Sequence, residues 1–229
     1  QVPAAAVATA DAEELSRRLK RGPVRVRLVL GCETRPEVPA ANVIGELRGG
    51  EHPDEIVVIG GHLDAWDLGR GAQDDGAGCV HVLEAVRLLK VCGVVPKRTI
   101  RVVLFANDEN GLRGAKAYAE AHAAEMGLHK AAIETDSGGF TPIGFASSLR
   151  DAEANRVEAL LAPLKEWNAG QFLPGAGSCG ADISPLFERG VPCFGLWVDN
   201  GRYFDYHHTA VDDLPSVNER ELALGSAAI

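Results

Sequence analysis

The chain has 229 residues, of which 46% are hydrophobic and 24% are charged. This composition is close to the average for globular domains and excludes collagen-like repeats, coiled coil and extensive disorder. The formal net charge of −9 argues against nucleic acid or an anionic membrane as the main partner, and no apolar run approaches the roughly 20 residues that a membrane-spanning helix needs.

The predicted elements alternate between strands and helices along most of the chain. In chain order, the patterns indicate a helix at 11–20, strands at 24–31, 42–48 and 55–61, a helix at 75–90, a strand at 98–106, a helix at 111–124, a strand at 130–136, a helix at 151–165, a strand at 191–198 and a terminal helix at 216–229. Such alternation predicts an α/β fold with a mostly parallel sheet that is covered on both faces.

Metal-binding types of side chain follow the predicted strands, where ligands of open α/β sheets bind. They are His62, Asp64, Asp74, Asp75, Asp108, Glu109, Asp136, His207, His208, Asp212 and Asp213. Each alone is explained as a helix cap or a turn residue. Together at one sheet edge they would repel one another without cations, which predicts a binuclear metal site. Imidazole and carboxylate ligands without thiolate suit zinc, with Mn²⁺ or Co²⁺ as substitutes.

Other chemistries lack support in the residue patterns. The sequence has no G-x-S-x-G nucleophile elbow and no P-loop, and Gly69-x-Gly71 lacks the third glycine of a dinucleotide-binding loop. None of the five cysteines is spaced as in a structural zinc site. Cys79 lies on an apolar helical stripe and is predicted to be core, and a disulfide between Cys179 and Cys193 stays open.

Five ordered segments resemble the motifs of the co-catalytic di-zinc exopeptidases. They are GGHLDAWDLGRGAQDDGAG at 60–78, RTIRVVLFANDENGLRGA at 98–115, ETDSGG at 134–139, GADISP at 180–185 and YHHTAVDDL at 206–214. The chain is most similar to the carboxypeptidase Q branch, which is related to bacterial leucyl aminopeptidases and glutaminyl cyclases. The resemblance covers nearly the whole chain and implies a three-layer α/β/α fold with a mixed, mostly parallel central sheet.

The resemblance implies five ligands for two zinc ions. One ion is bound by His62 and Asp136, the other by Glu109 and His208, and both by Asp74. Asp74 is preferred to Asp75 because the bridging residue opens the D-D-G-x-G run of the family. His208 is preferred to His207 because the family's ligand is followed by Thr or Ser and, four residues on, by Asp212.

The activity implied is hydrolysis of terminal peptide bonds of dipeptides or short peptides, by a metal-bound hydroxide with a carboxylate as general base. The base precedes Glu109 and is Asp108, where relatives usually carry a Glu that is one methylene longer. Asp64 is expected to accept the second ring N–H of His62 and fix its tautomer. His207 is expected to donate to the oxyanion.

Residues near these motifs leave some roles open. Asp182 in GADISP matches a family motif, but its spacing assigns it no role. Five aromatic residues are either core or the lining of a pocket for the substrate side chain: Trp66, Trp197, Tyr203, Phe204 and Tyr206.

Two other functions also stay open at this stage. A glutaminyl-cyclase-like acyltransferase shares the fold but typically holds one zinc ion, and a catalytically weak binding domain could use the same scaffold. The complete ligand set argues against both.

The resemblance also sets expectations about organisation and location. Residues 1–22 are expected to be the tail of, or linker from, a protease-associated insert, and residues 23–229 a catalytic domain that is incomplete at both ends. Relatives are exported, periplasmic or lysosomal, so we expect an exported protein, although Gln1-Val2-Pro3 lacks the basic start of a signal peptide. A homodimer is a further expectation.

Overall fold

The computed structural model describes residues 4–33 and 35–229, and the expectation for Gln1-Val2-Pro3 lies outside these residues. The chain divides into two compact units, 1–39 and 40–229. In the first unit, helix α1 (Thr9–Leu19) confirms the predicted helix. The strand predicted at 24–31 is wrong, because residues 25–31 are exposed and pair with none of the strands that the structure describes.

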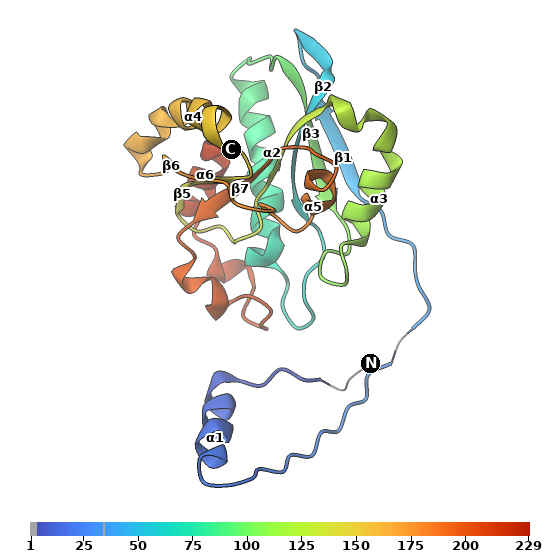
Figure 1. The fold of residues 1–229 in the computed structure, drawn as a ribbon, viewed down its shortest axis with the longest axis vertical. Helices are drawn as coiled ribbons and strands as arrows, with labels where there is room; N and C mark the ends of the chain where they lie inside the picture. Colours follow the sequence, from blue (N-terminus) through green and yellow to red (C-terminus); the bar gives the residue numbers. More distant parts are fainter. Residues whose placement is uncertain (1–3, 34) are drawn as a thin grey trace. The chain divides into compact units, whose positions relative to one another are not determined.

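The second unit contains a seven-stranded mixed sheet with the order β1-β3-β2-β4-β7-β5-β6 (Figure 1). Its strands are β1 (Val43–Leu47), β2 (His52–His62), β3 (Arg98–Phe105), β4 (His129–Glu134), β5 (Pro142–Ser147), β6 (Gln171–Pro174) and β7 (Cys193–Val198). Strands β3, β2, β4 and β7 run parallel, while β1 is antiparallel to β3 and β5 to β7. The predicted mixed, mostly parallel sheet is therefore confirmed, with β5 and β6 as additions that the sequence patterns did not indicate.

Helices cover both faces of this sheet, as Figure 1 shows for α2 and α3. The α-helices of this unit are α2 (Ala77–Val91), α3 (Arg113–Ala121), α4 (Asp151–Leu160), α5 (Ser184–Phe187) and α6 (Glu219–Ala228). Successive strand residues alternate between two core clusters: Val58 packs with residues of α3 and α5, whereas Ile59 packs with Cys79 and Val82 of α2. Both faces of β2 are thus buried, which explains its continuous apolar run.

Short helical turns complete the unit. The irregular turn η1 spans Ala72–Gly76, and the 3-10 turns are η2 (Ala123–Leu128), η3 (Ala162–Trp167), η4 (Asn200–Asp205) and η5 (Leu214–Ser216). The predicted helices at 75–90, 111–124 and 151–165 each overlap part of one of these turns, so the regular α-helices are shorter than predicted.

The start of α2 lies directly against the end of β4. A Cβ atom added at Gly78, in the first turn of α2, would come within 1.9 Å of the carbonyl oxygen of Thr135, so only glycine fits there. This close approach brings η1, just before α2, to the edge of the sheet where the parallel strands end.

Two of the five cysteines, Cys79 and Cys193, are buried in the core, and the other three are partly or fully exposed. Cys79 is buried, as predicted. Cys179 and Cys193 are free thiols, and both donate hydrogen bonds to the Gly177 carbonyl oxygen. None of the described helices combines the length and the hydropathy that a membrane-spanning segment requires.

Candidate metal centre

The predicted site residues all lie at one edge of the sheet, where the parallel strands end. His62 is the last residue of β2. Asp108 and Glu109 follow β3, Asp136 follows β4, His207 and His208 come after β7 and η4, and Asp74 lies in η1. This is the edge at which open α/β sheets bind their ligands.

Asp74 lies at the centre of the site. Its Oδ1 is 3.1 Å from Nε2 of His62, and its Oδ2 is 3.4 Å from Nε2 of His208. On one side, Nε2 of His62 is also 3.5 Å from Oδ1 of Asp136. On the other side, Nε2 of His208 is 2.9 Å from Oε2 of Glu109. The five predicted ligands therefore form two groups that share one carboxylate, one oxygen facing each group.

His207 lies beside the second group. Its Nε2 is 3.5 Å from Oδ2 of Asp74, and its ring stacks on that of His208. Ligand atoms of Asp74, His207 and His208 all lie within 4.8 Å of one another, so distance to Asp74 alone does not separate the two histidines. His208 differs in its contact with Glu109.

Asp64 contacts the site differently from the prediction. Nδ1 of His62 is 2.9 Å from the carbonyl oxygen of Asp64 and 3.8 Å from its carboxylate, so the backbone is the closer partner of the ring. The carboxylate instead accepts hydrogen bonds from the backbone N–H groups of Asp108, at 3.0 Å, and Glu109, at 3.3 Å. Asp64 thereby holds the segment after β3 against the segment after β2.

Two further buried carboxylates, which sequence analysis placed near the site without a role as ligand or base, hold its backbone. Asp212 accepts the N–H groups of Gln73 at 2.7 Å and of Asp74 at 3.1 Å. Asp75 accepts the N–H of His62 at 3.0 Å. The sequence indicated Asp212 as one of the acidic residues near the predicted site and by its spacing from His208, but not as a support for Asp74. Its contacts join residues that are far apart along the chain, which local patterns do not reveal.

Burial and mutual repulsion dominate the electrostatics. Burial raises the pKa of Asp136 to about 6 and, with the Asp74 charge, raises the pKa of Glu109. Burial also raises the pKa of Asp108. For His62, burial favours the neutral ring, but the neighbouring carboxylates of Asp136 and Asp74 outweigh it and raise the pKa. The site concentrates negative charge in a poorly solvated place.

The carboxylate oxygens fit a metal. Oδ1 of Asp108, Oε1 of Glu109 and Oδ1 of Asp136 are buried without a hydrogen-bond partner among the described residues. Buried oxygens of this kind are costly unless a donor or a cation faces them. A donor set of imidazole nitrogen and carboxylate oxygen, without thiolate, suits zinc. The residues therefore fit divalent cations at both groups.

Asp182 is buried next to the site. Its side chain is 1% exposed, and both carboxylate oxygens lack a hydrogen-bond partner among the described residues. Burial, followed by the Asp108 charge, raises its pKa to about 8. The carboxylate of Glu134 holds the surrounding segment by accepting the N–H groups of Ala181 and Ile183, each at 2.8 Å. The GADISP segment thus supplies a buried carboxyl group that holds its proton up to about neutral pH, because burial and the Asp108 charge disfavour its ionised form.

The five aromatic residues left open by sequence analysis have different environments. Trp66 stacks on His208, with ring centroids 4.4 Å apart and planes 10° apart. Tyr203 and Tyr206 pack against a core cluster around Phe140, Phe145, Leu196 and Val198. Phe204 is 77% exposed, and Trp197 is partly buried in β7.

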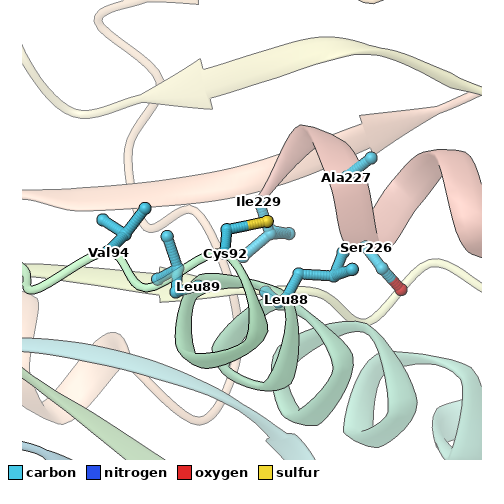
Figure 2. Close-up of a pocket in the computed structure, with 8 residues that line it drawn as sticks. Leu88, Leu89, Cys92, Val94, Ser226, Ala227 and Ile229 are labelled. Atoms are coloured by element: carbon cyan, nitrogen blue, oxygen red, sulfur yellow. The ribbon is translucent and has the colours of Figure 1, made fainter.

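A separate pocket of about 250 Å³ lies between the end of α2 and α6 (Figure 2). Its lining is mostly aliphatic, from Leu88, Leu89, Val94 and Ile229, and the side chains of Cys92 and Ser226 add a thiol and a hydroxyl group. It has no acid, imidazole or base, so its lining offers no group for acid–base catalysis.

Comparisons with known proteins agree with this geometry. Residues 42–227 match the model of peptidase family M28. Carboxypeptidase Q of Rattus norvegicus is 34% identical over 99% of this chain and 48% of its own length, so the chain spans about half the length of the curated relatives it matches.

Two solved structures extend the comparison. A peptidase M28 precursor from Shewanella amazonensis SB2B superposes with a TM-score of 0.85 at 37% identity, over 95% of this chain and 49% of that one. BSAP, a zinc aminopeptidase from Bacillus subtilis, shares the fold with a TM-score of 0.65 at 21% identity, over 82% of this chain and 48% of that one.

Proposed function

The chain belongs to peptidase family M28, and on this premise we propose that it is a di-zinc metallo-exopeptidase that hydrolyses terminal peptide bonds of dipeptides or short peptides. The observation that carries the proposal is the position of Asp74, whose two oxygens face two separate groups of metal-ligand type. A carboxylate shared in this way is suited to bridge two cations.

The ligand assignment follows the two groups. His62 and Asp136 would hold one ion, Glu109 and His208 the other, and Asp74 both. When bound, such ions polarise a peptide carbonyl and lower the pKa of an attacking water. The unpartnered oxygens of Glu109 and Asp136 support this assignment. Asp75 and Asp212 stabilise it through the backbone N–H groups of ligand residues.

Asp108 is suited to be the general base. Its Oδ1 is buried and has no hydrogen-bond partner within the described chain, while Oδ2 is 3.9 Å from Nε2 of His62. Burial raises its pKa, which makes the carboxylate a stronger base than an exposed aspartate. Asp64 fixes the Asp108 backbone. Asp108 would take the proton of the attacking water and deliver it to the leaving amine, despite its shorter arm.

His207 is suited to stabilise the oxyanion. Burial lowers its pKa, so near pH 7 the ring is neutral and keeps one N–H to donate. Its side chain is 28% exposed, so it is accessible to a substrate at the site, and its Nε2 lies near Asp74. An exported location and a homodimer belong to the proposal on the resemblance alone.

A substrate panel tests the proposed function. The purified chain is assayed by mass spectrometry on dipeptides, aminoacyl-amides, N-blocked dipeptides and a peptide with N-terminal Gln, with and without a chelator. We expect addition of one water across the terminal peptide bond, loss of this activity with chelator, and recovery with zinc. Loss of ammonia from the Gln peptide without hydrolysis would indicate the cyclase alternative. Full zinc loading without turnover would indicate a binding domain.

A further inference from the structure

The ring of His208 lies between two other rings. Trp66 stacks on it at 4.4 Å with planes 10° apart, and His207 stacks on it at 3.7 Å with planes 18° apart. Two rings this close and this nearly parallel to a third cannot share one of its faces. Trp66 and His207 therefore cover opposite faces of His208.

His208 needs such support more than His62 does. The side chain of His62 is 1% exposed, its Nδ1 meets the Asp64 carbonyl oxygen, and its backbone N–H is held by Asp75. The side chain of His208 is 32% exposed, and among the described residues no hydrogen bond fixes its Nδ1. Ligating histidines usually have their second nitrogen hydrogen-bonded, which sets the direction of the ring.

We propose that Trp66 is a positioning residue for the metal ion that His208 binds: its indole plane fixes the His208 ring so that Nε2 points at Glu109 and Asp74. This inference rests on the proposed function, because it concerns one of the two ions assigned there. A flat indole on one face and His207 on the other restrict the tilt of the ring, which a hydrogen bond at Nδ1 would otherwise do.

The loop of Trp66 is itself attached to the loop of His208. The N–H of Arg70 donates to the carbonyl oxygen of Asp212 at 2.9 Å. A Cβ added at Gly69 would lie 2.7 Å from the carbonyl oxygen of Thr209, so these two loops are in close contact. The Trp66–His208 stack therefore forms without a bound ligand. Its role in holding His208 explains why the chain keeps an indole that is 43% exposed at this position.

The magnitude follows from the strength of an aromatic stack. Removing the indole frees the His208 ring and should lower the affinity for the second zinc equivalent roughly 3- to 10-fold. This is the range that corresponds to the stabilisation from one stacked pair. The first equivalent, which does not involve His208, should keep its affinity. Phenylalanine can stack on imidazole and should restore most of the loss.

The test compares zinc binding by the wild-type chain, Trp66→Ala, Trp66→Phe and the control Trp167→Ala, whose indole is exposed in η3, at 48%. Affinities for each equivalent are measured by competition with a chromophoric chelator, and tryptophan fluorescence is recorded during the same titration. We expect only Trp66→Ala to bind the second zinc equivalent more weakly than the wild-type chain. The change in tryptophan fluorescence that accompanies this equivalent should be absent from both Trp66 variants.

Each outcome has one meaning. A second equivalent that Trp66→Ala binds as tightly as wild type overturns the positioning role and leaves the proposed function intact. Equal weakening in Trp66→Phe and Trp66→Ala overturns it as well, since stacking would then not be the cause. Failure of the wild-type chain to bind a second equivalent overturns both proposals.

Discussion

Replacing Asp212 by Asn tests whether this carboxylate holds the segment that carries Asp74. Asp212 is 3% exposed, and its two oxygens accept the backbone N–H groups of Gln73 and Asp74 at 2.7 and 3.1 Å. Asn has almost the same shape but only one acceptor oxygen, and its NH₂ group would face a backbone N–H. The substitution therefore leaves a buried N–H unpaired without opening a cavity.

The size of the effect follows from these two contacts. A hydrogen bond to a charged acceptor contributes about 1.5–3 kcal/mol, and a buried N–H left unpaired costs about 1–3 kcal/mol. With one bond lost and the other made to a neutral oxygen, we expect the free energy of unfolding to fall by about 2–4 kcal/mol. For a domain of this size that lowers Tm by about 5–15 °C. Displacement of Asp74 should also weaken metal binding about 10- to 100-fold.

The measurement is urea unfolding of the apo chain, followed by zinc titration of the same samples. Asp205→Asn is the matched control, because it makes the same chemical change at an exposed position in η4 and should alter stability by less than about 0.5 kcal/mol. If Asp212→Asn matched this control in stability and in zinc affinity, the carboxylate would not hold the Asp74 segment.

Three further predictions follow. Asp108→Asn should lower kcat by about 10²- to 10⁴-fold with zinc content unchanged, while Asp108→Glu stays active; a wild-type rate in the Asn variant would exclude Asp108 as the base. Burial lowers the pKa of His81 to about 4 from 6.5, so between these pH values the unfolded chain binds more protons, and stability should fall by up to about 3 kcal/mol on acidification. For His81→Leu, the free energy of unfolding, measured with denaturant, should depend less on pH in this window. An unchanged dependence on pH would show that His81 is not the group responsible. Gly78→Ala should lower the free energy of unfolding by about 3 kcal/mol or more, because its Cβ would meet the Thr135 carbonyl oxygen at 1.9 Å. The control Gly127→Ala places its Cβ in open space. Equal denaturation midpoints for the two variants would contradict this clash.

The central elements could be predicted from the sequence because their patterns are local. The β2 segment is a continuous apolar run since both faces are buried, and α2 carries a regular apolar stripe. Strand β5 carries Gly144 directly against the backbone of Gln171, and such a strand has little pattern to recognise. The alternating segment at 24–31 resembles a strand but has no pairing partner among the described residues, which only the structure reveals.

For the site, the motifs indicated which residues gather but not how they are supported. The five predicted ligands lie together at the sheet edge. That His62 Nδ1 meets the carbonyl of Asp64 and not its carboxylate depends on a backbone direction that residue types do not encode. The bond from Gln73 to Asp212 spans 139 positions, and the stack of Trp66 on His208 joins two distant loops.

Zinc stoichiometry tests the central claim most directly. Native mass spectrometry of the wild-type chain, titrated with zinc alongside Asp74→Ala, counts the ions that each folded chain retains. The shared position of Asp74 predicts two ions on the wild-type chain and a loss of paired binding in the variant. A wild-type chain that retains only one ion or none, or a variant that binds two as tightly as wild type, would contradict a binuclear centre bridged by Asp74.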